Sequence, residues 1–430
     1  MRFLHPEKTP SLVYANRHGE IKNLPGLHMA GRSGNFFFRP AAAELIPLPE
    51  GSELFLLPDR MPVGISPEND DPVLLDHDPD NPGETVQAVA AFMAPAHTAI
   101  HSAAYEQTRD DLAPLPLFAY TAVGWLDGKF WVSAFRSDPD RRQDIRQFDQ
   151  EKIKRKTTLK LKKNPRNRLV QHLGKCCLTY GCPAARNYFL GRWEAPLPSS
   201  PVCNARCVGC ISLQPSGCCP ATQERINFTP TVTEISGIAI PHLKQAPRPV
   251  VSFGQGCEGE PLMQADTLAK AIRSIRSRTD AGTINLNSNS SLPDKIKLLT
   301  EAGLDSLRVS LNSAREAYHA RYYRPVNFSL ADVLQSIDVM KQADRFVSLN
   351  YFILPGFTDD PDEFAALCDL IENHRPDLIQ LRNLNMDPDW YFETVEHRPD
   401  SPPMGVLIWL EKLKTLFPAL RFGYFNPPLR

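Results

Sequence analysis

Cysteine is absent from the sequence before Cys176, although the 430-residue chain contains ten cysteines. A secreted disulfide scaffold is usually short and has cysteines along its length, so this distribution argues against such a scaffold. Closely spaced cysteines in one part of a chain are more typical of metal binding in a reducing compartment. We therefore expect metal-binding cysteines after residue 175.

The sequence also lacks a long apolar run and a large net charge. No run of about 18 apolar residues is present, so no helix is expected to cross a membrane. The first residues, Met1 to Pro6, lack the apolar core of a signal peptide. The formal net charge of −1 argues against nucleic-acid binding by the molecule as a whole. These absences predict a cytoplasmic protein with no membrane partner.

Residues 1–150 are expected to form a β-rich N-terminal domain of unknown role. Proline and glycine interrupt its short apolar runs. A hairpin is predicted over residues 117–135, because Asp127-Gly128 is a strong two-residue turn signal between β-rich arms. Residues 88–104 are predicted to form a buried helix interrupted by Pro95.

Residues 151–195 are expected to form a connector that contains both basic residues and cysteines. The segment from Lys152 to Arg168 is rich in lysine and arginine and has no acidic residue. Such a run is compatible with a solvated linker and with a contact surface for RNA or another polyanion. Both interpretations remain open at this point.

From residue 196 onward, apolar strand patterns alternate with amphipathic helix patterns, which favours a parallel α/β architecture. Strands are predicted near 198–203, 249–254, 282–287, 306–311, 346–354 and 377–382; helices are predicted over 233–243, 265–278, 293–302, 330–343 and 361–373. These units predict a partial (β/α)6 barrel over residues 196–395. Residues 396–430 are expected to add a C-terminal helix and strand.

Cys203, Cys207 and Cys210 form a C-x3-C-x2-C motif directly after the first predicted strand. Thiolates are the usual ligands of iron–sulfur clusters, and three of them leave one iron of a cubane open to an external ligand. A zinc knuckle is the alternative, although structural zinc usually takes four protein ligands, often as two separated pairs.

This motif, in its predicted barrel, resembles that of the radical S-adenosylmethionine (radical SAM) superfamily over residues 196–395. The resemblance implies a [4Fe–4S] cluster on Cys203, Cys207 and Cys210, with these cysteines serving catalysis and metal binding. It also implies reductive cleavage of S-adenosylmethionine (SAM) to a 5′-deoxyadenosyl radical. An electron donor such as flavodoxin or ferredoxin is expected as a partner.

Further segments resemble other motifs of this family in the expected order. The stretch from Gly256 to Leu262 is similar to the family's glycine- and glutamate-containing SAM loop, with Gly259 and Glu260 as the best matches. By the same resemblance, polar residues after later strands are candidates to contact SAM. The candidate cofactor-binding residues are Gly259, Glu260, Asn287, Ser288, Ser310, Asn312, Ile353 and Arg382.

One position departs from the family pattern. The residue before the third cysteine is usually aromatic in this family and packs near the adenine, but here it is Gly209. Phe228 or another aromatic residue is expected to fill that space.

Five further cysteines flank the motif: Cys176, Cys177, Cys182, Cys218 and Cys219. Their density suggests ligands for an auxiliary iron–sulfur cluster. A zinc site, a redox pair and unliganded buried thiols are the alternatives.

The large N-terminal region and the basic run favour a macromolecular substrate, either a peptide or protein or an RNA. A second hypothesis is a radical SAM enzyme of small-molecule or cofactor biosynthesis. A third is a non-catalytic, metal-stabilised adaptor that binds RNA or protein. Glu260 argues against the adaptor, which would have no need of a carboxylate in that loop.

Overall fold

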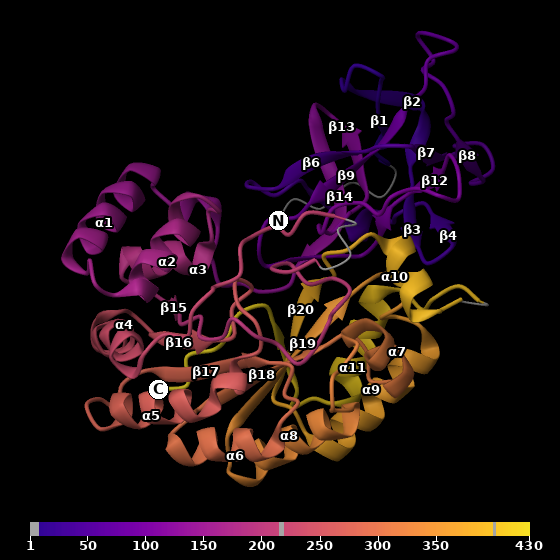
Figure 1. Cartoon of the computed structure of the whole chain (residues 1–430). Coiled ribbons are helices and arrows are strands. Elements are labelled where there is room, and N and C mark those ends of the chain that lie inside the picture. Colours follow the sequence, from indigo (N-terminus) through magenta and orange to yellow (C-terminus); the bar gives the residue numbers. More distant parts are fainter. Residues whose placement is uncertain (1–7, 215–218, 399–400) are drawn as a thin grey trace.

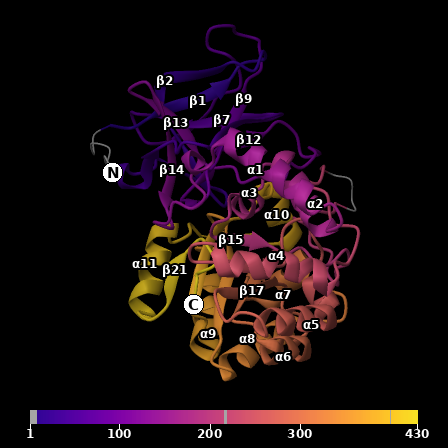
Figure 2. The ribbon, with the colours of Figure 1, turned by 90° about the vertical axis from the view of Figure 1, so that its left-hand side faces the viewer.

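The computed structural model describes residues 8–214, 219–398 and 401–430. These residues form a β-rich region, a group of three helices and a curled parallel sheet with helices on its outer side (Figure 1). A view turned by 90° shows the β-rich region stacked on one end of the parallel sheet (Figure 2). Within the described ranges, no helix is both long enough and apolar enough to cross a membrane.

The β-rich region consists mainly of one antiparallel sheet that contains β10-β14-β13-β1-β2-β7-β12 in that order. The region's strands are β1 (Ser11–Ala15), β2 (Ile21–Met29), β3 (Gly31–Ser33), β4 (Phe36–Phe38), β5 (Leu45–Pro47), β6 (Glu53–Leu57), β7 (Arg60–Ile65), β8 (Pro72–Leu74), β9 (Gln87–Phe92), β10 (His97–Ala99), β11 (Ser102–Ala103), β12 (Tyr105–Gln107), β13 (Val123–Leu126) and β14 (Lys129–Arg136).

The predicted hairpin is confirmed, although its first strand begins at Val123 instead of Leu117. Leu126 pairs with Lys129, and both turn residues, Asp127 and Gly128, have positive φ. Two consecutive residues with positive φ are what a tight two-residue hairpin turn requires.

The helix predicted over residues 88–104 is wrong, because this segment contains β9, β10 and β11. Pro95 cannot donate the hydrogen bond that a continuous helix would need. The run from Ala88 to Ala91 is buried throughout, because β9 pairs with both β1 and β6. Its continuous apolar character reflects a central strand and not a buried helix.

Three helices follow: α1 (Gln150–Lys163), α2 (Arg168–Leu178) and α3 (Pro183–Leu190). The basic run therefore lies on α1 and at the start of α2. The Asp149 side chain caps α1 by accepting a hydrogen bond from the Lys152 backbone N–H. The Asn167 side chain caps α2 by accepting one from the Val170 backbone N–H. Most of the basic segment is thus helical in this structure.

The parallel sheet has seven strands in sequential order: β15 (Glu194–Pro196), β16 (Val250–Phe253), β17 (Thr283–Ser288), β18 (Ser306–Leu311), β19 (Phe346–Ile353), β20 (Leu378–Asn383) and β21 (Arg421–Gly423). The strand predicted over 198–203 is wrong, since the first strand ends at Pro196. Pro198 and Pro201 cannot donate to a strand ladder, and the backbone N–H groups of Ser199 and Ser200 instead bond the Glu258 carboxylate.

The remaining helices are α4 (Val232–Gln245), α5 (Ala265–Arg276), α6 (Pro293–Ala302), α7 (Glu316–Tyr323), α8 (Leu330–Gln342), α9 (Pro361–His374), α10 (Pro388–Val395) and α11 (Val406–Leu416). They match the predicted helices closely, except that α7 and α10 were not expected. The predicted α/β fold with a curled, half-barrel parallel sheet and a β-rich N-terminal region is confirmed.

The parallel sheet has one apolar and one polar face. Leu286, Val309 and Leu349 belong to the buried apolar core, whereas the alternate positions carry polar side chains. Neighbouring strands place these side chains in rows, such as Asn287–Arg308–Ser348 and Ser310–Asn350–Gln380. Parallel sheets are commonly apolar on both faces, so a polar inner face indicates a lined binding space.

The C-terminal tail connects the two sides of the curled sheet. Asn426 donates a 2.9 Å hydrogen bond to Glu194, which lies on β15, and accepts one of the same length from Gln380 on β20. Leu429 bonds Thr283 on β17. The tail therefore links the first strand of the sheet to the last ones.

The N-terminal region contacts the sheet where β19 and β20 end. Arg60 and Asp387 form a buried ion pair at 2.9 Å, and Thr98 donates to the Leu381 carbonyl at 2.7 Å. Gly356 has a positive φ, and a Cβ there would lie 1.8 Å from the Gly34 nitrogen. Only glycine allows this close approach, which holds the N-terminal region against the strand ends.

Candidate active site

The cysteine motif lies in a loop between β15 and α4, and α7 holds this loop in place. The backbone N–H groups of Arg206 and Val208 donate to the Tyr323 and Tyr322 carbonyls at 2.9 and 3.0 Å. Cys203, Cys207 and Cys210 are all partly exposed. The loop is thus fixed by backbone hydrogen bonds, and its three cysteine residues are each partly buried.

The surroundings of the thiols are unfavourable for unassisted ionisation. Burial raises the pKa of Cys203 to about 11, and the nearby charge of Glu260 adds to this effect. Burial also raises the pKa of Cys207 well above its usual value. Since thiolates are the metal-binding form, the positive charge of a metal would have to stabilise them. Arg225 supplies one positive group, with Nη2 donating to Cys210 Sγ at 3.4 Å.

Glu260 lies close to this loop and is held by three donors. Its carboxylate accepts hydrogen bonds from Ser288 Oγ at 2.6 Å, the Asn289 N–H at 2.9 Å and the Leu262 N–H at 3.0 Å. Its own N–H donates to the Val202 carbonyl, next to Cys203. Burial nevertheless raises the pKa of Glu260 to about 7. A positively charged ligand would favour the ionised form.

Gly259 allows the Glu260 loop to approach the cysteine loop. A Cβ on Gly259 would lie 2.1 Å from the Val202 carbonyl oxygen, and the Gly259 N–H donates to the Ser200 carbonyl at 2.7 Å. No side chain fits at such a distance. Glu258 fixes the same region, because its buried carboxylate binds Ser199 and Ser200.

Of the two predicted residues at the end of β17, Ser288 donates to Glu260, whereas Asn287 does not. The Asn287 side chain donates to the Gly254 carbonyl at 2.9 Å and accepts from Asn285 at 2.8 Å. These hydrogen bonds give Asn287 a structural role across the inner face of the sheet.

The other predicted residues are distributed around the sheet. Ser310 is partly exposed on β18, and Ile353 is buried in the main core. Asn312 is fully buried, with its amide donating to Tyr318 and Tyr391 and with Oδ1 unpaired. Arg382 donates to the Tyr424 carbonyl of the C-terminal tail at 3.0 Å. None of these four has a hydrogen bond to Glu260 among the bonds found in the described residues.

Tyr322 occupies the space beside Gly209. A Cβ on Gly209 would lie 2.8 Å from the Tyr322 hydroxyl oxygen, and the tyrosine is buried against Phe352 and Tyr391. Phe228 lies elsewhere, against Arg168 and His172. The sequence did not reveal this pairing, because Tyr322 is far from Gly209 along the chain.

Four of the five additional cysteines lie in the described part of the chain, and Cys219 is in a different buried group from the other three. Cys176 and Cys177 are buried in the main core, with Cys182 packed against it. Cys219 belongs to a separate group of buried residues around Tyr322 and Tyr391. Cys218 lies outside the described residues. The four described cysteines of the predicted set are therefore divided between two buried groups, and the auxiliary cluster stays a prediction.

The region from residue 197 to residue 368 matches the family model described as the radical SAM superfamily. This match covers the cysteine loop, the Glu260 loop and most of the parallel sheet. The region from residue 197 to residue 368 therefore belongs to the radical SAM superfamily. Radical SAM proteins are enzymes that cleave SAM to a radical, and they need an electron donor. The match favours an enzyme over the adaptor hypothesis.

Solved structures with the most similar shapes include several radical SAM enzymes. One is a radical SAM methyltransferase from Sphaerobacter thermophilus, with 13% identity and a TM-score of 0.37; the match covers 54% of this chain and 65% of that one. Methylornithine synthase (PylB) has 14% identity and a TM-score of 0.37, with coverage of 65% and 74%. Streptococcus suis SuiB bound to precursor peptide SuiA has 11% identity and a TM-score of 0.34, with coverage of 50% and 44%.

The chain spans just under two thirds of the first of these structures. No curated protein sequence matches the chain.

Proposed function

We propose that Cys203, Cys207 and Cys210 bind a [4Fe–4S] cluster and that Glu260 binds the amino group of SAM beside it. The observation that carries this proposal is the buried Glu260 carboxylate, which accepts three hydrogen bonds next to the cysteine loop. A buried carboxylate that lacks a cationic partner is costly. The ammonium group of SAM would supply that partner through charge-assisted hydrogen bonds.

The donor set fits the proposed cofactors. Three thiols from one short loop suit a cubane that leaves one iron open, and when bound the cluster supplies the electron that breaks the sulfur–carbon bond of SAM. Gly259 permits the approach of the Glu260 loop, and Ser288 orients the carboxylate. Tyr322, beside Gly209, is the aromatic residue that we propose to pack near the adenine.

Unpaired polar atoms on the inner face of the sheet support the proposal that a polar ligand binds against this face. Asn350 Oδ1, Gln380 Oε1 and Arg308 Nε are buried and have no partner. Buried polar groups normally have hydrogen-bond partners, so a bound ligand would satisfy them. We propose that Ser310, Asn312 and Arg382 contact SAM or the substrate. Asn287 and Ile353 are proposed to support these contacts.

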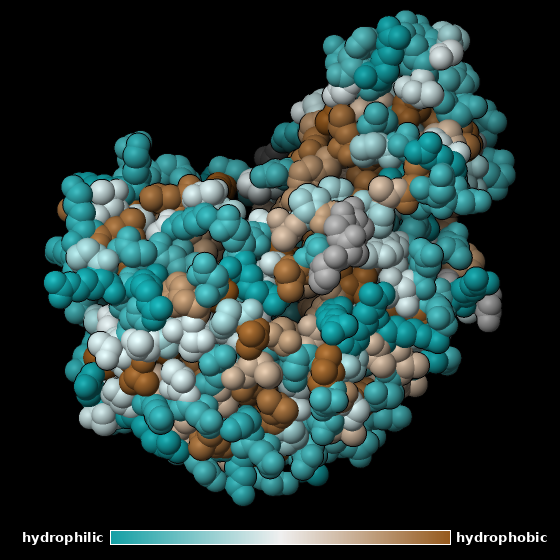
Figure 3. Space-filling model, viewed as in Figure 1, coloured by the Kyte–Doolittle hydropathy of each residue, from teal (hydrophilic) through white to brown (hydrophobic). Residues whose placement is uncertain are grey.

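A macromolecular substrate is the finer proposal. On α1, Lys154, Arg155 and Lys163 are exposed, and Figure 3 shows hydrophilic residues mixed with some hydrophobic ones over this part of the surface. A cationic helix attracts polyanions, which suits an RNA or an acidic peptide or protein. Flavodoxin or ferredoxin is the proposed electron donor, and the free cysteines suit a reducing, cytoplasmic compartment.

A small-molecule substrate is the second candidate, and the C-terminal tail favours it. Asn426 joins Glu194 to Gln380 across the open side of the sheet. A tail in this position restricts entry to the inner face from that side. The two substrate classes therefore depend on different surfaces, which experiments can separate.

The cofactor proposal is tested by anaerobic reconstitution with iron, sulfide and dithionite. The protein should contain about four irons per chain and should convert SAM into 5′-deoxyadenosine. Glu260→Gln should retain the cluster's absorbance but bind SAM at least about tenfold more weakly, a loss of roughly 1.4 kcal/mol. Glu301→Gln, at an exposed position of α6, is the matched control and should behave as wild type.

The substrate proposal is tested by reversing the charges of Lys154, Arg155 and Lys163 together. Binding to polyanions should weaken and its salt dependence should decrease, while SAM cleavage without substrate should be unchanged. Reversal of three exposed lysines on other helices, Lys270, Lys297 and Lys414, is the control. Equal effects of both triple variants would contradict a specific role of α1.

A further inference from the structure

A second group of metal-ligating side chains lies outside the cysteine loop. His172 and Cys176 are four positions apart on α2, so they share one face of the helix. Cys257 comes from the loop after β16. His172 Nε2 is 3.5 Å from Cys257 Sγ and 3.6 Å from Cys176 Sγ, and all three ligand atoms lie within 4.8 Å of one another.

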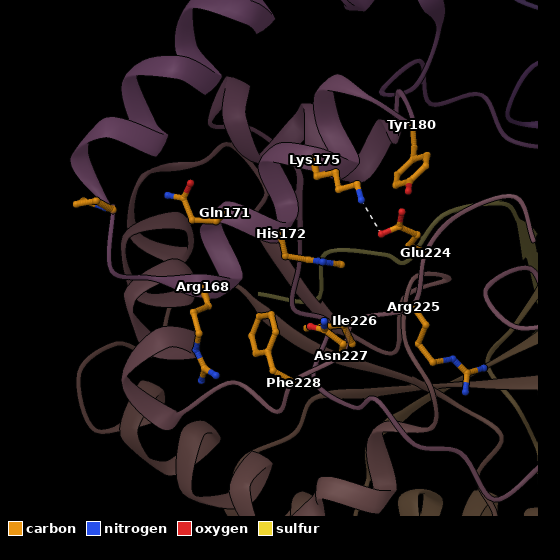
Figure 4. Close-up of a pocket in the computed structure, with 11 residues that line it drawn as sticks. Arg168, Gln171, His172, Lys175, Tyr180, Glu224, Arg225, Ile226, Asn227 and Phe228 are labelled. Atoms are coloured by element: carbon orange, nitrogen blue, oxygen red, sulfur yellow. Dashed lines mark hydrogen bonds and ion pairs between the residues drawn. The ribbon is translucent and has the colours of Figure 1, made fainter.

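Of this group, His172 lines a cavity of about 340 Å³ between α2 and residues 224–228, whereas Cys176 and Cys257 are not part of its lining. Figure 4 shows His172 projecting from α2 toward residues 225 and 226. The Cys176 and Cys257 side chains are buried, at 2% and 6% exposure, whereas His172 is partly exposed. The sulfur atoms are thus shielded from bulk solvent, and the imidazole faces the cavity.

We propose that His172, Cys176 and Cys257 bind a single tetrahedral metal ion, with zinc as the preferred ion. Tetrahedral zinc with the usual Zn–S and Zn–N bond lengths separates a sulfur from a nitrogen ligand by about 3.5 Å. The two observed nitrogen–sulfur distances equal this value within 0.1 Å. Thiolate and imidazole are also the donor types that zinc prefers.

The same distances argue against a cubane at this position. In a cubane each protein ligand binds a different iron, so the ligand atoms lie farther apart than ligands of one shared ion. The proposal therefore assigns one ion to this group and leaves the [4Fe–4S] cluster to the cysteine loop. It does not depend on the proposed function of that loop.

Neighbouring thiols do not complete the group. The Cys177 thiol is 3.5 Å from the Thr157 hydroxyl and therefore faces α1, and Cys182 is not among the atoms within the 4.8 Å limit. The fourth position of the ion is therefore left for water or a small ligand from solution. Such a three-ligand site has an open position.

The ion would fasten α2 to the loop that carries Glu260. Cys257 directly precedes Glu258, which binds Ser199 and Ser200, and the Cys257 carbonyl accepts a 2.8 Å hydrogen bond from the Ile226 N–H. Binding would hold both cysteines as thiolates and release protons to solvent. The ion would thus link α2 to the loop after β16, two segments that are far apart in the chain.

The test uses the full chain in which Cys203, Cys207 and Cys210 are all replaced by alanine, so that the motif cannot bind metal. Purified with zinc in the medium, this protein should retain about one zinc per chain. Adding Cys257→Ser should abolish zinc binding, whereas adding Cys177→Ser, the matched neighbour of Cys176, should leave it intact. Cobalt(II) in place of zinc should give thiolate-to-cobalt charge-transfer absorption that Cys257→Ser removes.

Three results would overturn the proposal: no zinc or cobalt bound, iron with inorganic sulfide bound at this group, or equal metal loss in the Cys177→Ser and Cys257→Ser proteins. If Cys257→Ser does not fold, His172→Ala replaces it, because His172 is partly exposed and its removal leaves the buried thiols in place. If the triple variant does not fold, zinc is measured in the wild-type protein with and without His172→Ala. Zinc content unchanged by His172→Ala would then exclude the site.

Discussion

The cysteine loop takes its three sulfur atoms from one short segment, residues 203–210, whereas His172 and Cys257 of the second group are 85 positions apart in the chain. The loop has little regular structure and is held by backbone hydrogen bonds to α7. The second group relies on a helix face and a strand-end loop. Among the described residues, the second group has its ligand atoms within 4.8 Å of one another, and the loop does not meet this limit. Residues spaced closely along the chain thus indicate one kind of metal site, and residues brought together only by folding indicate another.

Removing one loop cysteine should have the largest effect and should show whether the two sites are independent. Cys207→Ala is expected to abolish the cluster's absorbance and all formation of 5′-deoxyadenosine, since a cubane would lose one of its three protein ligands. Zinc at the second group should be unchanged. Iron, sulfide and zinc analysis checks both statements, with Cys368→Ala on α9 as the control. Loss of zinc together with iron would show that the sites are coupled.

Removing metal from the second group should have an intermediate effect. A zinc chelator is expected to lower the melting temperature by on the order of 5 °C, because ligands that bind only the folded state stabilise it. The Cys257→Ser protein should melt at the lower temperature with or without chelator. Thermal unfolding under anaerobic conditions measures both. An equal chelator effect in wild type and Cys257→Ser would mean that the metal responsible binds elsewhere.

Gly256 and Gly259 lie in the loop that also carries Cys257 and Glu260, and their alanine variants should differ in effect. Gly259→Ala should lower the free energy of unfolding by about 2 kcal/mol and weaken SAM binding, because its Cβ would meet the Val202 carbonyl at 2.1 Å. Gly256→Ala should cost less than about 1 kcal/mol. Its Cβ would meet the ends of the Gln223 and Ile211 side chains, which can move.

Urea unfolding and SAM titration of the two alanine variants provide the measurement. If Gly256→Ala were the more damaging change, the loop would be anchored to the 211–223 segment and not to residues 200–202.

The smallest expected effect concerns the helix that carries His172 and Cys176. Glu234 accepts hydrogen bonds from the Arg168 side chain and backbone at 2.8 and 3.0 Å, which ties α2 to α4. The pKa of Glu234 is lowered to about 2, and the hydrogen bond from the Arg168 side chain is the largest cause. Glu234→Gln should therefore reduce the free energy of unfolding by about 1 kcal/mol at neutral pH.

The pH dependence of the free energy of unfolding tests whether the charge of the Glu234 carboxylate causes this difference. A lowered pKa means that the stabilisation is complete above the unfolded value of 4.5 and is lost as the pH falls toward 2. The difference between wild type and Glu234→Gln should therefore shrink over this interval. A difference that stays constant with pH would assign the effect to packing and not to the carboxylate charge.

Local patterns predicted most of the parallel sheet and its helices. The strands β16 to β20 and the helices α4, α5, α6, α8 and α9 match the predictions closely because their periodic apolar residues form one continuous core. The errors occurred where a local pattern had two interpretations. The run from Ala88 to Ala91 is apolar at every position, and only its pairing with β1 and β6 makes it a strand.

The sequence alone was enough to predict the cysteine motif, its resemblance to radical SAM proteins and the order of the strands along the chain. Each of these depends on residues that are close together in the chain. The tertiary structure decided which distant residues meet: Tyr322 beside Gly209, Asn426 between Glu194 and Gln380, and His172 with Cys176 and Cys257. These contacts depend on how the elements pack, and no local pattern of residue types records that packing.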